Sequence, residues 1–211
     1  MRIAVVDYGM GNLHSVSKAV EHVGSRVQVE VTSDPARVAS ADRVVFPGQG
    51  AMPECMREMD ARGLRPAVVE ASRKRPFLGI CIGLQMLFER SDEGGVAGLG
   101  LLAGTVRRFP ESAMVDSRGW KLKVPHMGWN RVKQARHHAL WSGLEDGTHF
   151  YFVHSYFPQA DEEALVLGTT EYGVPFTCAV ARDNIFAVQF HPEKSASAGL
   201  RLLANFLNWN P

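Results

Sequence analysis

Apolar runs and helically spaced segments alternate through the first ninety residues, and this alternation limits the folds that the chain can adopt. Short apolar runs, typical of buried strands, occur at residues 2–6, 27–31, 44–46 and 76–81. Helical patterns occur at residues 13–23, after Asp34-Pro35, at 65–74 and at 83–90. Gly24 is placed to end the first helix and Asp34 to cap the second. Because such strands are joined by helical crossovers, we expect a parallel sheet flanked by helices.

The pattern changes after Gly94. Short β-rich runs separated by Gly, Pro and Asp occur at residues 105–109, 150–153, 165–170, 176–181 and 185–190, and an amphipathic helix spans 197–208. No repeat, low-complexity segment or linker divides the chain. We therefore expect residues 1–211 to form a single α/β domain, with an open, mostly parallel sheet and an added antiparallel portion.

The composition argues against several classes of protein. Hydrophobic residues make up 45% of the 211 residues, enough for a core without disulfides or metal. The net charge of +1 gives no sign of a surface for nucleic acid or an acidic membrane. No stretch approaches the roughly 18 apolar residues of a membrane span, and the first apolar run is too short for a signal peptide. Cys55, Cys81 and Cys178 lack the Cys-x-x-Cys spacing, so we expect no disulfide framework, no zinc site and a cytoplasmic location.

The pentapeptide Gly79-Ile80-Cys81-Ile82-Gly83 lies between a predicted strand and a predicted helix. Glycines two residues before and after a central side chain are typical of a nucleophile elbow, in which a strained turn raises that side chain above the sheet. A cysteine there lies at a helix N-terminus, which favours the reactive thiolate. The amide of Ile82 would face the same point and could stabilise an oxyanion. The alternative is that Cys81 is a small buried core residue, the interpretation we favour for Cys55 and Cys178.

A candidate base follows the last apolar run, in Gln189-Phe190-His191-Pro192-Glu193. A thiol nucleophile needs a base, and the base needs a third group to fix its tautomer. In an extended segment residues two apart face the same side, so Glu193 could orient His191. Pro192 restricts the backbone between them and favours an extended His191. The alternative is a surface turn with a solvated glutamate.

These two segments resemble the class I (triad-type) glutamine amidotransferases. Five further motifs resemble one branch of that family, the glutaminase subunit of imidazole glycerol phosphate synthase: Asp7–Leu13, Pro47–Gly50, His126–Asn130, Tyr151–Tyr156 and Gln189–Ser195. The resemblance implies a flavodoxin-like open sheet and makes Cys81 the nucleophile, His191 the base and acid, and Glu193 its orienter. It also implies that Gly48, Gln49 and Gly50 form the oxyanion loop with Ile82, and that Gln85, Ser155 and Tyr156 line the glutamine pocket. Gln49 departs from the branch, which more often has a small apolar residue there.

The resemblance also implies a partner. No cofactor is expected, and the motifs leave no segment for a site that accepts ammonia, so a cyclase subunit of (β/α)₈ barrel type would use it within a heterodimer. The resemblance implies that the cyclase makes imidazole glycerol phosphate and an aminoimidazole carboxamide ribotide. Alternatives are a glutaminase of the anthranilate, aminobenzoate or guanylate branch, a binding module without chemistry, and a cysteine peptidase or hydrolase.

Overall fold

The computed structural model describes residues 1–116 and 118–211, whose strands form a nine-stranded sheet and a three-stranded sheet. The large sheet has the order β2-β1-β3-β4-β12-β11-β10-β7-β8. Its first five strands are parallel: β1 (Arg2–Val6), β2 (Gln28–Thr32), β3 (Arg43–Phe46), β4 (Phe77–Ile80) and β12 (Ile185–Val188). The other four are antiparallel: β7 (His126–Gln134), β8 (Thr148–His154), β10 (Val166–Tyr172) and β11 (Val174–Arg182). The expected α/β fold with an antiparallel portion is confirmed.

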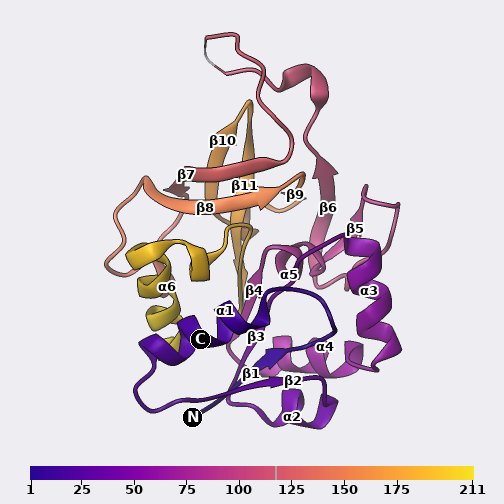
Figure 1. The fold of residues 1–211 in the computed structure, drawn as a ribbon, viewed down its shortest axis with the longest axis vertical. Coiled ribbons are helices and arrows are strands. Elements are labelled where there is room, and N and C mark those ends of the chain that lie inside the picture. Colours follow the sequence, from indigo (N-terminus) through magenta and orange to yellow (C-terminus); the bar gives the residue numbers. More distant parts are fainter. Residues whose placement is uncertain (117) are drawn as a thin grey trace.

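Six α-helices occur in the described part of the chain: α1 (Leu13–Val23), α2 (Pro35–Ser40), α3 (Met52–Ala61), α4 (Arg65–Lys74), α5 (Ile82–Gln85) and α6 (Ala196–Asn208). Helix α1 packs against α6, and α2 packs against α4. Figure 1 shows these two groups flanking the parallel strands, with the antiparallel strands on the far side of α5. The two helix pairs therefore cover the parallel strands, and the antiparallel portion lies beyond α5.

Local signals explain where the first helices begin and end. The Asn12 side chain accepts a hydrogen bond from the Ser15 amide at the start of α1, and Gly24 follows its last residue. Asp34 caps α2 by accepting from the Ala36 amide, with proline at the first helical position. The predictions for Gly24 and Asp34 are confirmed.

The segment 83–90 is not a helix throughout, so that prediction is wrong. Helix α5 ends at Gln85, and β5 (Phe88–Ser91) begins three residues later. Strand β5 pairs with β6 (Leu102–Arg108), which pairs with β9 (Tyr156–Ala160), completing the small sheet. An unbroken apolar run fits a buried strand as well as a buried helix, and here pairing with a distant segment decides between them.

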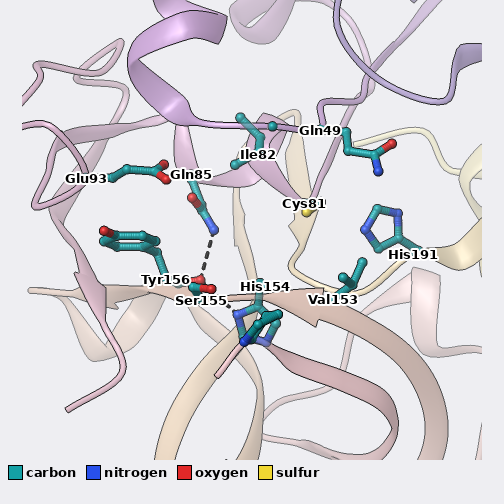
Figure 2. Close-up of a pocket in the computed structure, with 12 residues that line it drawn as sticks. Gln49, Cys81, Ile82, Gln85, Glu93, Val153, His154, Ser155, Tyr156 and His191 are labelled. Carbon is teal, nitrogen blue, oxygen red and sulfur yellow. Dashed lines mark hydrogen bonds between the residues drawn. The ribbon is translucent and has the colours of Figure 1, made fainter. Parts of the chain in front are cut away.

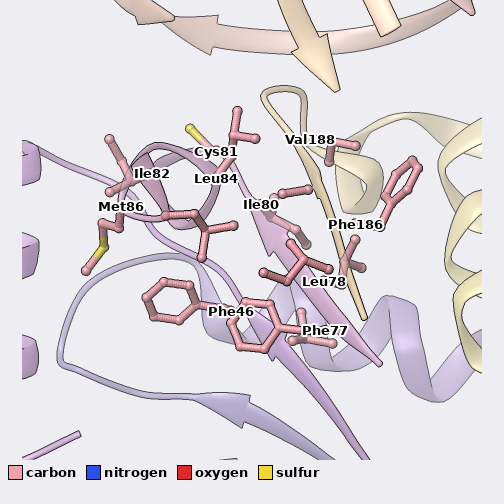
Figure 3. Packing of buried hydrophobic residues seen from close by; sticks show 14 of the residues in the cluster. Phe46, Phe77, Leu78, Ile80, Cys81, Ile82, Leu84, Met86, Phe186 and Val188 are labelled. Carbon is pink, nitrogen blue, oxygen red and sulfur yellow. The ribbon is translucent and has the colours of Figure 1, made fainter. Parts of the chain in front are cut away.

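The central strands are buried on both faces. Phe77, Leu78 and Ile80 of β4 are at most 1% exposed, as are Phe46 and Val188 on the neighbouring strands. Figure 3 shows these side chains packed beneath the turn that carries Cys81. Burying each large apolar side chain contributes about 1.5–3 kcal/mol. The strand ends that carry the site are thus fixed by a continuous core.

Candidate active site

Three neighbouring parallel strands end at the same edge of the large sheet. Strand β4 lies between β3 and β12, with Val45 opposite Leu78 and Val188 opposite Ile80. The chain continues from β4 into Cys81, and from β12 it reaches His191 three residues later. Because carboxyl ends of parallel strands meet at one edge, segments a hundred residues apart in sequence come together here.

Cys81 occupies a strained turn. Its φ of 56° and ψ of −112° lie where L-residues are rarely found, and its amide donates to the Val188 carbonyl at 2.8 Å. A Cβ on Gly83 would lie 1.8 Å from the Phe46 carbonyl oxygen, and one on Gly79 would lie 2.9 Å from the Ala187 Cβ. Both glycines are therefore required by close packing. The predicted elbow geometry is confirmed, although α5 is a single turn of four residues.

His191 and Glu193 form a buried pair. The Nδ1 of His191 donates to Glu193 Oε1 at 2.7 Å, and the two side chains are 5% and 2% exposed. His191 itself is extended as predicted, with a φ of −103° and a ψ of 97°, but the rest of the segment is not, because Pro192–Lys194 forms a 3₁₀ turn. The turn still brings the carboxylate to the imidazole. The His191 amide also donates to the Tyr151 carbonyl, which ties the histidine to β8.

The charge state of His191 follows from its neighbours. Burial favours the neutral ring, but the Cys81 sulfur and the Glu193 carboxylate outweigh it and raise the pKa of His191 to about 10. The Nε2 of His191 has no hydrogen-bond partner in the described chain, and Figure 2 shows the ring and the Cys81 sulfur at the same end of the pocket. These contacts therefore favour a protonated His191 at the end of the pocket where the Cys81 sulfur lies.

A cavity of about 220 Å³ opens beside Cys81. It brings together eight of the ten residues predicted for the site: Gln49, Gly50, Cys81, Ile82, Gln85, Ser155, Tyr156 and His191. Glu193 lies behind His191, and Gly48 packs beneath the loop, where an added Cβ would lie 2.2 Å from the Tyr8 hydroxyl. Drug-sized ligands fill about 300–1,000 Å³, so this cavity suits a small metabolite.

The far end of this cavity has a residue that the sequence did not reveal. Glu93 lines the cavity at the end opposite Cys81 and His191, beside Tyr156 (Figure 2). Its Oε2 accepts from the Met52 amide at 2.7 Å, which holds the carboxylate in place. Glu93 follows a short strand in a glycine-rich turn and has no local motif, so only the fold connects it to the site. The pocket therefore has a cysteine sulfur at one end and a carboxyl group at the other.

Two core side chains form hydrogen bonds to the loop Pro47–Gly50, which follows β3. The Tyr8 hydroxyl donates to the Pro47 carbonyl at 2.8 Å, and the Cys55 thiol donates to the Gln49 carbonyl at 3.7 Å. Both carbonyls thus point into the core, and the Gln49 side chain lies at the cavity. Gly50 has a φ of 109°, which favours glycine at this position.

Two kinds of feature are absent from the described residues. Within residues 1–116 and 118–211, no three His, Cys, Asp or Glu side chains are grouped so that they could hold a metal ion. Among the helices of the same residues, none has the length and apolar character needed to cross a membrane.

Known proteins resemble this chain along its whole length. The sequence profile of the family "Glutamine amidotransferase class-I" matches residues 4–209. An "Imidazole glycerol phosphate synthase subunit HisH" from Dechloromonas aromatica is 68% identical and covers 99% of this chain and 97% of its own. A protein of the same name from Thiobacillus denitrificans is 66% identical, with 99% and 92% covered.

Solved structures share the fold. A crystal structure of a glutamine amidotransferase has a TM-score of 0.70 at 18% identity and covers 97% of each chain. The structure of PurLQS from Thermotoga maritima has a TM-score of 0.70 at 17% identity, with 98% of this chain and 97% of that chain covered. At such low identity the likeness concerns the fold alone, whereas the sequence profile and the curated relatives concern the family. The chain belongs to the class-I glutamine amidotransferases, within the branch of imidazole glycerol phosphate synthase subunits named HisH.

Proposed function

We propose that this chain hydrolyses glutamine to glutamate and ammonia, with Cys81 as nucleophile, His191 as general acid and base, and Glu193 as the group that orients His191. The observation that carries this proposal is the convergence of an elbow cysteine and a carboxylate-bound histidine on one small cavity. Family membership supports the same chemistry.

The proposed reaction has two steps, formation of a thioester and its hydrolysis. The Cys81 sulfur bonds to the side-chain amide carbon of glutamine, the carbon–nitrogen bond breaks, and His191 supplies the proton with which the nitrogen leaves as ammonia. His191, now neutral, takes a proton from water, which attacks the thioester and releases glutamate and the thiol. The amides of Gln49 and Ile82 are the proposed donors to the oxyanion of both steps.

The opposite end of the cavity accounts for recognition of an amino acid. With the side-chain amide of glutamine at Cys81, its α-amino and α-carboxylate groups extend toward Glu93 and Tyr156. The α-ammonium is a cation, and Glu93 is a fixed carboxylate in a partly enclosed site. We assign Glu93 to the α-ammonium, and Gln85, Ser155 and Tyr156 to the remaining polar groups.

The relatives bear the name of a synthase subunit, so a partner subunit is implied. We infer that the partner is a cyclase of (β/α)₈ barrel type, that it receives the ammonia for histidine biosynthesis, and that the heterodimer works in the cytoplasm. The cyclase would make imidazole glycerol phosphate and an aminoimidazole carboxamide ribotide. The relatives from Dechloromonas aromatica and Thiobacillus denitrificans are named as subunits of imidazole glycerol phosphate synthase, which favours this branch over the anthranilate, aminobenzoate and guanylate branches. The small cavity and the intact trio argue against the alternatives of a peptidase and of an inert binding module.

The test is an ammonia-release assay with glutamine. It compares this chain alone, with the purified cyclase, and with the cyclase plus its nucleotide ligand. We expect weak hydrolysis by the chain alone and a rise with each addition, because glutamine hydrolysis without an acceptor would waste the amide. Equal turnover in all three conditions would rule out coupling to the partner, and no turnover in any would refute the glutaminase assignment.

A further inference from the structure

Gln189 is a polar side chain buried completely at the end of β12. Its exposed fraction is 0%, and an amide in such a place is costly unless its donor and acceptor are both used. Both are used within the site. Its Oε1 accepts from Gln85 Nε2 at 3.0 Å, and its Nε2 donates to Cys81 Sγ at 3.7 Å. Gln189 therefore bridges the nucleophile and a residue that lines the cavity.

The bridge fixes the orientation of the Gln85 side-chain amide. Gln85 Nε2 donates to two acceptors, Gln189 Oε1 and the Tyr156 carbonyl, each at 3.0 Å. Both of its hydrogens are thus occupied. The Gln85 Oε1 is buried and has no partner in the described chain, and Gln85 lines the cavity. The group of this amide that has no partner is therefore an acceptor, which suits an N–H donor rather than a carbonyl.

The sulfur end of the bridge is held by the backbone. The backbone N–H of Gln189 donates to the Cys178 carbonyl at 2.8 Å, and the backbone N–H of Cys81 donates to the Val188 carbonyl at 2.8 Å. These two bonds fix the donor and the sulfur relative to each other. A donor aimed at sulfur binds more strongly when the sulfur is negative, because hydrogen bonds to ionised acceptors are about twice as strong as neutral ones.

We propose that Gln189 is a positioning residue of the glutaminase reaction: it holds the Cys81 sulfur in the reactive orientation, favours its thiolate, and fixes the orientation of the Gln85 amide. The inference rests on the proposed function, since it assigns Gln189 a role in the same site. Gln189 itself does not line the cavity.

The test replaces the amide by an apolar group of similar size, in Gln189→Met. The alkylation rate of Cys81 by iodoacetamide is followed by mass spectrometry between pH 6 and pH 9, without glutamine. We expect the rate at pH 7 to fall roughly five- to tenfold and the pH profile to move to higher pH, because a hydrogen bond to the charged thiolate is stronger than one to the neutral thiol by about the strength of one ordinary hydrogen bond. With the partner present, the KM for glutamine should also rise, because the Gln85 amide is free to turn.

A matched control is Gln134→Met. Gln134 Nε2 donates to the Leu144 carbonyl, at the end of β7 and outside the cavity. This variant should alkylate like the unchanged protein. An unchanged alkylation profile in Gln189→Met, with only a lower melting temperature, would overturn the proposal and show a purely structural role.

A second variant keeps the test decisive if Gln189→Met fails to fold. Gln189→Glu retains an acceptor for Gln85 but places a carboxyl group beside the sulfur. We expect Cys81 alkylation to slow increasingly as the pH rises, while the KM for glutamine stays near that of the unchanged protein. A pH profile of alkylation identical to that of the unchanged protein would refute the role. The alkylation readout needs no turnover. Failure of the proposed function would instead appear as glutamine hydrolysis that persists in Cys81→Ser.

Discussion

Acid should destabilise the protein through the buried pair His126 and His154. The Nδ1 of His154 lies 2.8 Å from the Tyr156 carbonyl and must carry the hydrogen, because a carbonyl only accepts. Its Nε2 is then the acceptor for His126 Nδ1 at 3.0 Å. A second proton on His154 would face the N–H of His126 and break this bond. Burial lowers the pKa of His154 to about 3 and that of His126 to about 4.

The size of the effect follows from the two states. In the unfolded chain His154 has a pKa near 6.5, so it binds a proton as the pH falls below that value, while the folded protein does not until about 3. The contribution of His154 to the free energy of unfolding is therefore fully present above pH 6.5 and decreases as the pH falls below that value. At pH 5 the loss is 1.5 pH units at about 1.36 kcal/mol each, or about 2 kcal/mol. His126 adds a loss in the same direction.

The assay is urea unfolding at pH 7.5 and pH 5.0, for the unchanged protein and for His154→Gln. Carboxylates and other histidines contribute to both proteins and cancel in the comparison. The drop in free energy of unfolding between the two pH values should therefore be smaller in His154→Gln by about 2 kcal/mol. The same substitution at the exposed His149 should leave the drop unchanged. If His154→Gln kept the full drop, the argument from burial would be refuted.

Three further predictions concern the site. Cys81→Ser should abolish glutamine hydrolysis. A glutamine-analogue electrophile should label Cys81 but neither Cys55 nor Cys178, because burial raises the pKa of both of those thiols. Labelling of either would contradict the assignment. Glu193→Gln should reduce kcat less than His191→Ala, since an unoriented imidazole still samples the productive tautomer, and equal losses would show that Glu193 does more than orient. Glu93→Gln should raise the KM for glutamine roughly ten- to hundredfold with kcat little changed, as for the loss of one charged hydrogen bond; an unchanged KM would place the α-ammonium elsewhere.

The parallel half of the sheet could be predicted because its signals are local. Each strand there is a short apolar run, and caps such as Asp34 mark the helix boundaries. Strand β7 could not be predicted in the same way. The apolar Met127 and Trp129 are more than half exposed whereas the polar His126 is buried, so the sequence lacks the usual strand pattern of apolar residues facing inward. The pairing partners β8 and β10 also lie later in the chain. The switch from α5 to β5 was missed for the same reason, since pairing with β6 decides it.

The site shows the same division between local and distant causes. Cys81 and His191 stand in short motifs whose spacing indicates a role, a cysteine flanked by glycines and a histidine two residues before a glutamate. The sequence alone therefore predicts both as site residues. Glu93 stands in no such motif, and Gln189 stands in the motif of His191 without a spacing that indicates a role for it. A glutamate in a turn and a glutamine at a strand end are ordinary until the fold places one at the end of the cavity and the other beside the sulfur. Their assigned roles stay predictions that the experiments above test.

The loop Pro47–Gly50 offers a physical basis for the weak hydrolysis that we predict for the chain alone. The hydroxyl of Tyr8 holds the Pro47 carbonyl and the thiol of Cys55 holds the Gln49 carbonyl, so the peptide units on both sides are anchored. Between them lies the peptide that joins Gly48 to Gln49, and in the described chain neither its carbonyl nor its N–H makes a hydrogen bond. A peptide unit anchored only at its two ends can turn with little change elsewhere, and glycine tolerates the altered dihedral angles. Because one missing oxyanion donor costs about 10²–10³ in turnover, a partner that fixed this single peptide would change the rate without moving Cys81 or His191.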